Sequence, residues 1–405
     1  MTLEQQESKH NFKAFIWHAT FLALASNFMD VDTVIPAMLV KVGGNSIQMG
    51  ILTTIMIGGA SFMQLFFSGI LSNKAYKKKF LLGAINSRVL TLLGLSALFM
   101  YADSISKTLV LISIFILISI FSFSGSFANV SYIDILGKTI SSKKRKHFFS
   151  LKQLISSIGL LSSAFMASYV LKKYSFPTNY SHTYFFAAIL LLIASLGFYF
   201  LSEKTPSTKK KTSLKAFFNQ MPKEIKSNSN LKAYLYIINF LGVGVSLLPF
   251  VVLLAKQNQG LSFSHIGTFI IYRTVGMLLG SLSLFFLAKR FRYKNVLLIN
   301  VFLGASIPII ALLIQHNSTL FPSIFLLAGI FVSTFKISMN GMLIEISTTE
   351  NRTLYAGMSG AGNILTSLFP LVAGILIQFW GFNLVFILIS VSMLLSFFAV
   401  LKLQC

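Results

Sequence analysis

Residues 108–136 read TLVLISIFILISIFSFSGSFANVSYIDIL, and Asp134 is the one charged residue in this stretch. A helix needs about 20 mostly apolar residues to cross the hydrocarbon core of a bilayer. The stretch is apolar on all faces of a helix, with serine and glycine interspersed, whereas a membrane barrel strand alternates over about ten residues. It therefore predicts a transmembrane helix.

The whole chain shares this character. Of its 405 residues 55% are hydrophobic and only 11% are charged, against roughly 25% charged residues in soluble proteins. The composition excludes an ordinary soluble enzyme and predicts an all-α polytopic membrane protein with twelve transmembrane helices. The twelve predicted spans are 14–40, 48–72, 80–102, 108–136, 148–171, 183–201, 233–255, 264–288, 296–314, 320–346, 354–379 and 383–401.

The basic residues behind the net charge of +24 are distributed as in a membrane protein. With the N-terminus inside, 26 of the 34 Lys and Arg residues lie in the inner segments and five in the outer loops. This bias predicts that both termini are cytoplasmic and that the basic residues face anionic lipid headgroups, so we expect no nucleic-acid partner. The usage rich in lysine, asparagine, isoleucine and phenylalanine is typical of an AT-rich bacterial genome, and we expect the protein in a bacterial inner membrane.

The cysteine and histidine residues predict neither a disulfide nor a metal site. Cys405 is the single cysteine, and the six histidines are scattered with no pair at i and i+4. A thiolate site needs several cysteines. We therefore expect no metal and no cofactor, and the absence of an intramembrane histidine or acid cluster argues against an enzyme.

The spans divide into two similar halves. The lysine-rich segment 202–232 is the one long polar stretch, and we predict a linker with a short surface helix near 214–221. It separates an N-terminal bundle of six helices, residues 1–201, from a C-terminal one, residues 233–405. Near the end of the fourth span of each half, Asn129…Asp134 is echoed by Asn340…Glu345. Such repeats build transporter folds, so we expect two pseudo-symmetric bundles.

The loop after the second span resembles a motif of the major facilitator superfamily, Gly-x-x-x-Asp-Arg-x-Gly-Arg-Lys. Residues 69–78 read GILSNKAYKK, with Asn73 where the family has Asp and Tyr76 where it has the second Gly. The resemblance implies that this loop latches the inner gate, with Asp134 paired to Lys74 or Lys77. The inner-gate residues that it implies are Gly69, Asn73, Lys74, Lys77, Asp134 and Glu345.

Several charged residues lie deep inside predicted spans: Asp30, Asp32, Arg88, Arg273 and Lys336. A charged side chain at mid-bilayer costs about 2.5–3.5 kcal/mol on insertion scales and usually faces a cavity or a partner. The resemblance implies that the third span is peripheral. We therefore expect Arg88 to extend toward the cytoplasm or to pair with Asp134, with contact to the substrate as the alternative.

The first span contains two candidate proton carriers. Asp30 and Asp32 lie about 200° apart around a continuous helix, Asp30 in line with small and polar residues and Asp32 with apolar ones. We predict that Asp30 faces the central cavity and exchanges a proton, with Asp32 as the second candidate. A hydrogen bond between Asp30 and a neighbouring helix is the alternative.

The resemblance implies that spans one, four, seven and ten line the transport path, and all four carry polar stripes. The predicted substrate-binding residues are Asn27, Asn129, Tyr132, Asn239, Arg273, Lys336, Asn340 and Asn363. Two cations in the C-terminal half suggest an anionic or zwitterionic substrate, since Arg makes bidentate contacts with carboxylate or phosphate. The alternative is an ion pair of Asp30 with Arg273 or Lys336 that has no ligand role.

These features predict a secondary active transporter that moves a small organic solute across the lipid bilayer by alternating access. We expect it to be monomeric and coupled to protons, with uptake by symport. A proton-driven exporter of amphipathic drugs is the alternative, because 41 Phe residues could line a greasy pocket. A non-transporting membrane scaffold or sensor is a third hypothesis, although no large soluble domain accompanies the spans.

Overall fold

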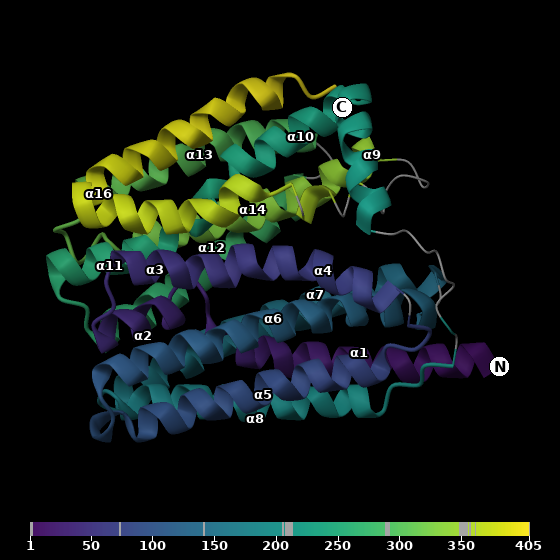
Figure 1. Cartoon of the computed structure of the whole chain (residues 1–405), viewed down its shortest axis with the longest axis horizontal. Helices are drawn as coiled ribbons and strands as arrows, with labels where there is room; N and C mark the ends of the chain where they lie inside the picture. The colour runs from purple at the N-terminus through teal and green to yellow at the C-terminus, as the bar shows by residue number, and fades with distance from the viewer. Residues whose placement is uncertain are drawn as a thin grey trace. The chain divides into compact units, whose positions relative to one another are not determined.

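The structure is a computed structural model that describes residues 3–72, 74–140, 142–204, 206, 214–287, 292–347, 355, 358–360 and 362–404. Within these ranges it is all-α, with no β-strand. Eleven of the described helical segments are long and apolar enough to cross a membrane. The last of them contains α16 (Ile364–Leu401), which is interrupted at Gly381 (φ 78°) and doubles back there (Figure 1). This turn yields the twelfth span, as the sequence predicted.

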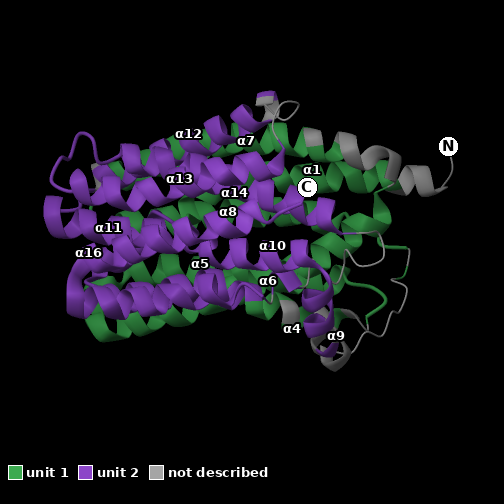
Figure 2. Ribbon diagram, turned by 90° about the horizontal axis from the view of Figure 1, so that it is seen from above, with its two compact units in different colours: residues 1–30, 62–211 green, residues 31–61, 212–405 purple. Residues whose placement is uncertain are grey.

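The chain forms two compact units, coloured separately in Figure 2. Unit 1 comprises residues 1–30 and 62–211. In it α1 packs against α7 and α8, and α5 packs against α6 and α8. Its helices are α1 (Leu3–Ser26), η1 (Asn27–Met29), all but the first two residues of α4 (Ala60–Ser72), α5 (Lys78–Met100), η3 (Ala102–Ser104), α6 (Lys107–Thr139), α7 (Ser142–Lys173) and α8 (Thr178–Tyr199).

Unit 2 comprises residues 31–61 and 212–405. In it α14 packs against α12 and α13, while α16 packs against α3, α10 and α13. The expected surface helix of the linker is present as α9. The helices, besides α16, are α2 (Val34–Val42), α3 (Ser46–Thr53), η2 (Thr54–Gly59), α9 (Leu214–Ser227), α10 (Ser229–Phe240), η4 (Gly242–Ser246), α11 (Leu247–Gln259), α12 (Phe263–Leu287), α13 (Tyr293–Leu313) and α14 (Ser323–Ile346).

Glycines bring α3 and α16 into backbone contact within unit 2. A Cβ on Gly50 would lie 2.4 Å from the Pro370 carbonyl oxygen, and one on Gly374 would lie 2.3 Å from that of Ser46. The Ser46 hydroxyl also donates to Gln378 Oε1 at 2.9 Å. Because of such contacts residues 31–61 associate with the C-terminal helices, although they precede the linker by more than a hundred residues.

The first span is broken, which contradicts the continuous helix predicted over 14–40. α1 ends at Ser26, Asp30 has an extended backbone (φ −69°, ψ 127°), and α2 begins at Val34. In unit 1 the Asn27 side chain donates to the Leu160 carbonyl at 2.7 Å, and its backbone N–H donates to the Ser163 hydroxyl at 3.1 Å. These bonds satisfy polar groups that the break releases. The angular argument that separated Asp30 from Asp32 was therefore wrong.

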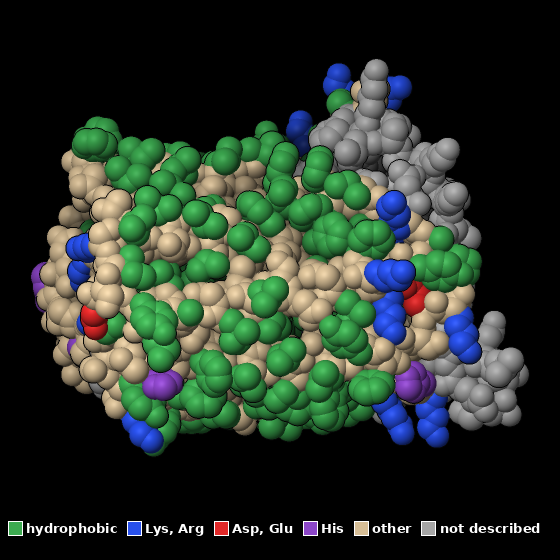
Figure 3. All heavy atoms as spheres, turned by 60° about the horizontal axis from the view of Figure 1, so that its bottom comes forward, with side chains coloured by type: hydrophobic (Ala, Val, Ile, Leu, Met, Phe, Trp, Pro, Cys, Tyr) green, Lys and Arg blue, Asp and Glu red, His purple; other side chains and the backbone are tan. Residues whose placement is uncertain are grey.

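The outer surface suits a lipid environment. On the face shown in Figure 3 hydrophobic side chains cover the middle of the helices, and Lys and Arg gather toward their ends. Large apolar residues such as Leu313 and Met100 are 78% and 69% exposed. Contiguous apolar surface of this kind is unusual in soluble monomers. The protein is a polytopic integral membrane protein.

Candidate functional site

Unit 1 contains a cavity of about 370 Å³. It lies among α1, α5, α6, α7 and α8, so every wall belongs to the same unit. Its polar and charged lining comes from His18, Ser26, Arg88, Asn129, Tyr132, Lys152 and Ser156. Among the described residues that line it none is acidic, so the cavity is electrically positive.

Arg88 and Lys152 supply this charge. The Arg88 guanidinium carbon lies 4.2 Å from the centre of the Phe121 ring, and Arg88 Nε is buried with no hydrogen-bond partner among the described residues. Lys152 Nζ donates to the Tyr132 hydroxyl at 3.3 Å and lies 5.2 Å from the centre of that ring. No described carboxylate lies within ion-pair distance of either cation. Aromatic faces are their neighbours in place of acids.

His18 adds a further polar edge. Its side chain is 5% exposed, and its ring stacks on Phe198 with centroids 4.0 Å apart. His18 Nε2 is buried and has no hydrogen-bond partner in the part of the chain that the structure describes. The cavity therefore combines two uncompensated cations with an unsatisfied imidazole nitrogen. An anion is the ligand that such a set of groups attracts, because it supplies the missing partner.

The sequence predicted only some of the residues that line this cavity. Asn129 and Tyr132, two of the predicted substrate-binding residues, line it. Arg88 lines the cavity, and the described contacts do not include the expected pair with Asp134, which binds Lys77 and Lys138 instead. His18 and Lys152 were missed. A usable signal was present for Arg88: it stands in the middle of an apolar helix with no acid one turn away.

A buried ion pair joins two elements of unit 2. Arg273 Nη2 of α12 contacts Asp32 Oδ2 in the turn before α2, and the two residues are 8% and 4% exposed. The prediction that assigned Asp32 to an apolar face was wrong, since the broken helix turns its carboxylate to α12. Because the pair neutralises Arg273, this arginine does not offer an uncompensated charge to a substrate.

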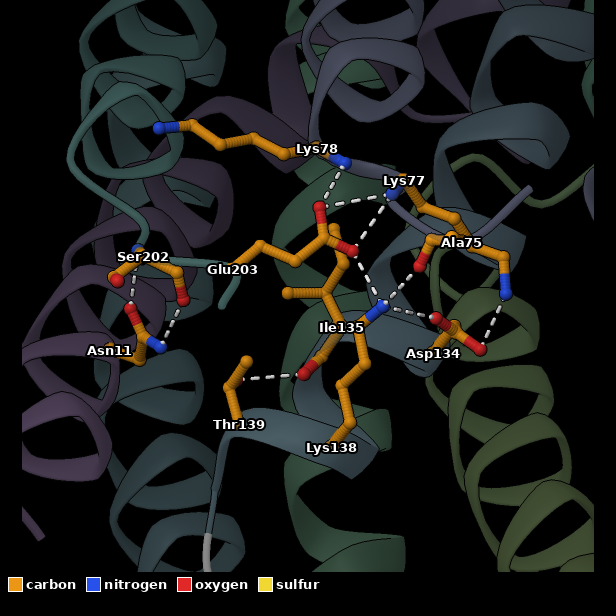
Figure 4. Close-up of polar contacts among 10 residues, drawn as sticks. All are labelled: Asn11, Ala75, Lys77, Lys78, Asp134, Ile135, Lys138, Thr139, Ser202 and Glu203. Atoms are coloured by element: carbon orange, nitrogen blue, oxygen red, sulfur yellow. Dashed lines mark hydrogen bonds and ion pairs between the residues drawn. The ribbon is translucent and has the colours of Figure 1, made fainter. Parts of the chain in front are cut away.

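A group of charged side chains lies where the end of α6 meets the segments before α5 and after α8 (Figure 4). We call Lys77, Asp134, Lys138 and Glu203 the four-charge cluster. Asp134 pairs with Lys77 at 2.6 Å and with Lys138 at 3.2 Å, and Lys138 pairs with Glu203 at 2.6 Å. The cluster therefore ties α6 to the loop before α5 and to the segment after α8.

Glu203 also caps α5. Its carboxylate accepts hydrogen bonds from the backbone N–H groups of Lys77 (2.8 Å) and Lys78 (2.7 Å), which begin that helix. The first N–H groups of a helix lack internal partners and favour a negative charge. Lys78 Nζ in turn donates to the Tyr199 and Leu201 carbonyls at 2.7 Å each, at the end of α8. Two helix ends thus stabilise each other.

Comparison with known proteins identifies the family. The model of the Major Facilitator Superfamily matches residues 16–254 and 233–404, which is almost the whole chain in two repeats. The chain belongs to this superfamily. The predicted family and the predicted fold class are thereby confirmed. The superfamily consists of membrane transporters, which supports membrane transport here.

Solved structures of the same fold include several transporters. The crystal structure of the nucleoside transporter NupG has a TM-score of 0.62 and 16% identity, covering 100% of this chain and 99% of that one. A POT family transporter in complex with a thioalcohol-conjugated peptide has a TM-score of 0.70 and 12% identity, covering 96% of this chain and 95% of that one. A bacterial metal transporter has a TM-score of 0.61 and 14% identity, covering 100% of this chain and 99% of that one. The chain has no match among curated protein sequences.

The superfamily motif takes an altered form in this chain. Lys77 is the predicted partner that pairs with Asp134, whereas Lys74 is exposed. Gly69 lies in the last turn of α4, and Asn73 lies outside the described residues. Glu203, which the sequence did not single out, provides the carboxylate that binds the start of α5. Its position in the polar segment after a predicted span gave no signal of this contact.

The remaining residues that the sequence predicted for the site either connect helices through hydrogen bonds or are exposed. Asn239 donates to the Gly362 carbonyl at 2.7 Å and accepts from the Leu365 N–H at 2.8 Å, so it links α10 to the start of α16. Asn363 precedes α16 directly. Lys336 and Asn340 lie four residues apart on an exposed face of α14, and Glu345 near its end is exposed too.

Glu203→Gln is expected to lower the free energy of unfolding by about 1.5–3 kcal/mol, the contribution of hydrogen bonds to a charged group. The change keeps the shape of a side chain that is 3% exposed but removes the charge that Lys138 and the α5 N-terminus require. Thermal unfolding of the purified protein in detergent measures the effect. Glu345→Gln, which removes an exposed acid, is the matched control. Equal unfolding temperatures for both variants would contradict the capping role.

Proposed function

We propose that this superfamily member transports a small organic anion, which binds in the cavity of unit 1. One observation carries the proposal: Arg88 and Lys152 line the cavity, while no described acid lines it or pairs with them. Charges placed in a membrane protein without partners are expensive. A carboxylate or phosphate of the solute supplies the partner, and Arg88 can hold it in a bidentate contact.

The uncharged lining sets the shape of the solute. His18, Asn129 and Tyr132 offer hydrogen-bond donors, and Leu22, Leu81 and Phe198 provide apolar walls. A ligand that matches them combines one anionic group with an apolar or aromatic body. Cationic amphipathic drugs fit less well because Arg88 and Lys152 repel them, which argues against the drug-exporter hypothesis.

The transport cycle, as we infer it, breaks and remakes contacts within unit 2. Residues 31–61 contact the C-terminal helices through Asp32 with Arg273 and through the close approach of α3 to α16. The predicted topology puts the turn at residues 43–45 on the non-cytoplasmic side of the membrane. These contacts therefore form the outer gate. The loop at residues 69–78 and the four-charge cluster belong to the inner gate.

We assign proton coupling to the same pair. Asp32 is the acid whose protonation removes the charge that holds Arg273, so a proton that reaches Asp32 loosens the outer gate. Asp30, two residues away, is the second candidate. We expect symport of the anion with protons into the cell, with both chain termini cytoplasmic and the protein acting as a monomer.

Counterflow in proteoliposomes tests the function. The purified protein is reconstituted into proteoliposomes, which are loaded in turn with organic anions, zwitterions, sugars and cationic dyes. Exchange of each solute is measured with and without a pH gradient. Anions alone are expected to exchange, and flux in Asp32→Asn is expected not to respond to the gradient. Exchange of cationic dyes but of no anion would overturn the substrate class, and a wild-type gradient response in Asp32→Asn would remove Asp32 from coupling.

A further inference from the structure

A second cavity lies within unit 2, between α10 and α16. Its volume is about 520 Å³, and it is lined by Ser229, Lys232, Ala233, Tyr236, Phe240, Leu395, Phe398, Ala399 and Lys402. On each helix the lining residues recur every three or four positions, so one face of α10 meets one face of α16. None of the described residues that line this groove is acidic.

The groove is polar at one end and apolar along the rest. Lys232 stands in the first turn of α10 and Lys402 directly after the end of α16, so the antiparallel helices bring both ammonium groups to the same end. Phe240 lies eight residues along α10 and Leu395 seven residues back along α16. At 1.5 Å per residue the apolar part therefore extends for roughly 10–12 Å from the lysines.

Aromatic side chains form the walls of the apolar part and remain open to the surroundings. The Tyr236 and Phe240 rings stack with centroids 5.9 Å apart, and Tyr236 and Phe398 are 50% and 63% exposed. Tyrosine rings at helix ends commonly lie at the level of lipid headgroups. Exposed rings beside a hollow leave room for an apolar chain from the surrounding bilayer.

The charged end of the groove is held in place. Lys294 Nζ donates to the Leu401 and Leu403 carbonyls at 2.9 and 2.7 Å, beside Lys402. Asn230, at the start of α10, accepts from the Gln404 N–H at 2.9 Å. The two lysines are therefore carried by backbone segments that are bonded together, which reduces the ordering needed when a ligand binds.

We propose that this groove binds one anionic phospholipid. The headgroup phosphate contacts Lys232 and Lys402, and an acyl chain lies along Tyr236, Phe240 and Phe398. The charge complementarity selects an anionic lipid over a zwitterionic one, and the length of the apolar part selects a lipid over a free phosphate. The positive-inside prediction places this end in the cytoplasmic leaflet, where basic residues attract anionic lipids.

Native mass spectrometry of the full-length protein in detergent tests the proposal, with phosphatidylglycerol and phosphatidylcholine added at equal concentration. The wild type is expected to retain one phosphatidylglycerol in preference to phosphatidylcholine. Lys232→Gln with Lys402→Gln is expected to weaken phosphatidylglycerol binding by about fivefold for each lysine. Ala399→Phe fills the apolar part without altering charge and is expected to weaken binding of both lipids.

The matched control is Lys223→Gln with Lys226→Gln. These exposed lysines lie on α9, which packs against α10, but do not line the groove. The control is expected to bind phosphatidylglycerol as the wild type does. The proposal is overturned by equal binding of the two lipids to the wild type, by an equal loss in the control, or by unchanged binding in Ala399→Phe.

Discussion

Arg88→Gln is expected to reduce the affinity for the transported anion by at least roughly a hundredfold. Removing one member of a buried charge pair costs about 3–5 kcal/mol, and each 1.4 kcal/mol is a factor of ten. Arg88 lines the cavity, with its guanidinium over Phe121 and no described acid to hold it. The measurement is equilibrium binding of the anion that gives the strongest counterflow, followed by its exchange rate.

The controls for this prediction separate charge from geometry and from folding. Arg88→Lys keeps the charge but loses the bidentate fork, so an intermediate loss is expected. Arg292→Gln removes an exposed arginine that lies outside the cavity and is expected to bind as the wild type does. Arg88→Gln should unfold at the wild-type temperature or above it, because a buried charge has been removed. Unchanged affinity in a folded Arg88→Gln protein would exclude the cavity as the binding site.

Asp32→Leu is expected to destabilise the protein by about 3–5 kcal/mol, because it leaves the charge of Arg273 buried. Both side chains are less than 10% exposed and belong to unit 2. Arg273→Met should be destabilising for the same reason, since it leaves the carboxylate behind. Thermal unfolding in detergent, read as loss of the monodisperse folded peak, measures both.

The double variant Asp32→Leu with Arg273→Met gives the decisive comparison. Replacing a buried pair with apolar side chains is often neutral or stabilising, so the double variant is expected to be more stable than either single one. Such non-additivity reports the coupling between the two residues. Asp103→Asn, which removes an exposed acid in η3, should leave stability unchanged. Additive losses in the double variant would show that the two side chains are not coupled.

The fold class could be predicted from the sequence because it depends on quantities that add along the chain. The apolar length of each span is read from consecutive residues, and the lysine bias is counted over loops. The motif at residues 69–78 and the echo of Asn129…Asp134 in Asn340…Glu345 then indicated the family. None of these observations requires knowledge of which helices touch.

The candidate site is formed by contacts between segments that are distant in the sequence. Hydrophobic periodicity along one segment carries no information about such contacts. The break at Asn27–Met29 is held by α7 through Leu160 and Ser163, so the direction of Asp32 could not follow from helical geometry alone. Glu203 caps a helix that begins more than a hundred residues earlier. Lys152 lies in a predicted span, but its contact with Tyr132 of another helix does not follow from that span alone.

Spans and orientation could be read from consecutive residues, because hydrophobic length and charge bias act locally, and the motif at residues 69–78 added the family. Which charges are compensated became known from the folded arrangement of the helices. Arg273 acquires Asp32, Asp134 acquires two lysines, and Arg88 acquires an aromatic ring and a cavity. The energy of a charge in a membrane depends on the groups within a few ångströms of it, and chain order does not specify those neighbours.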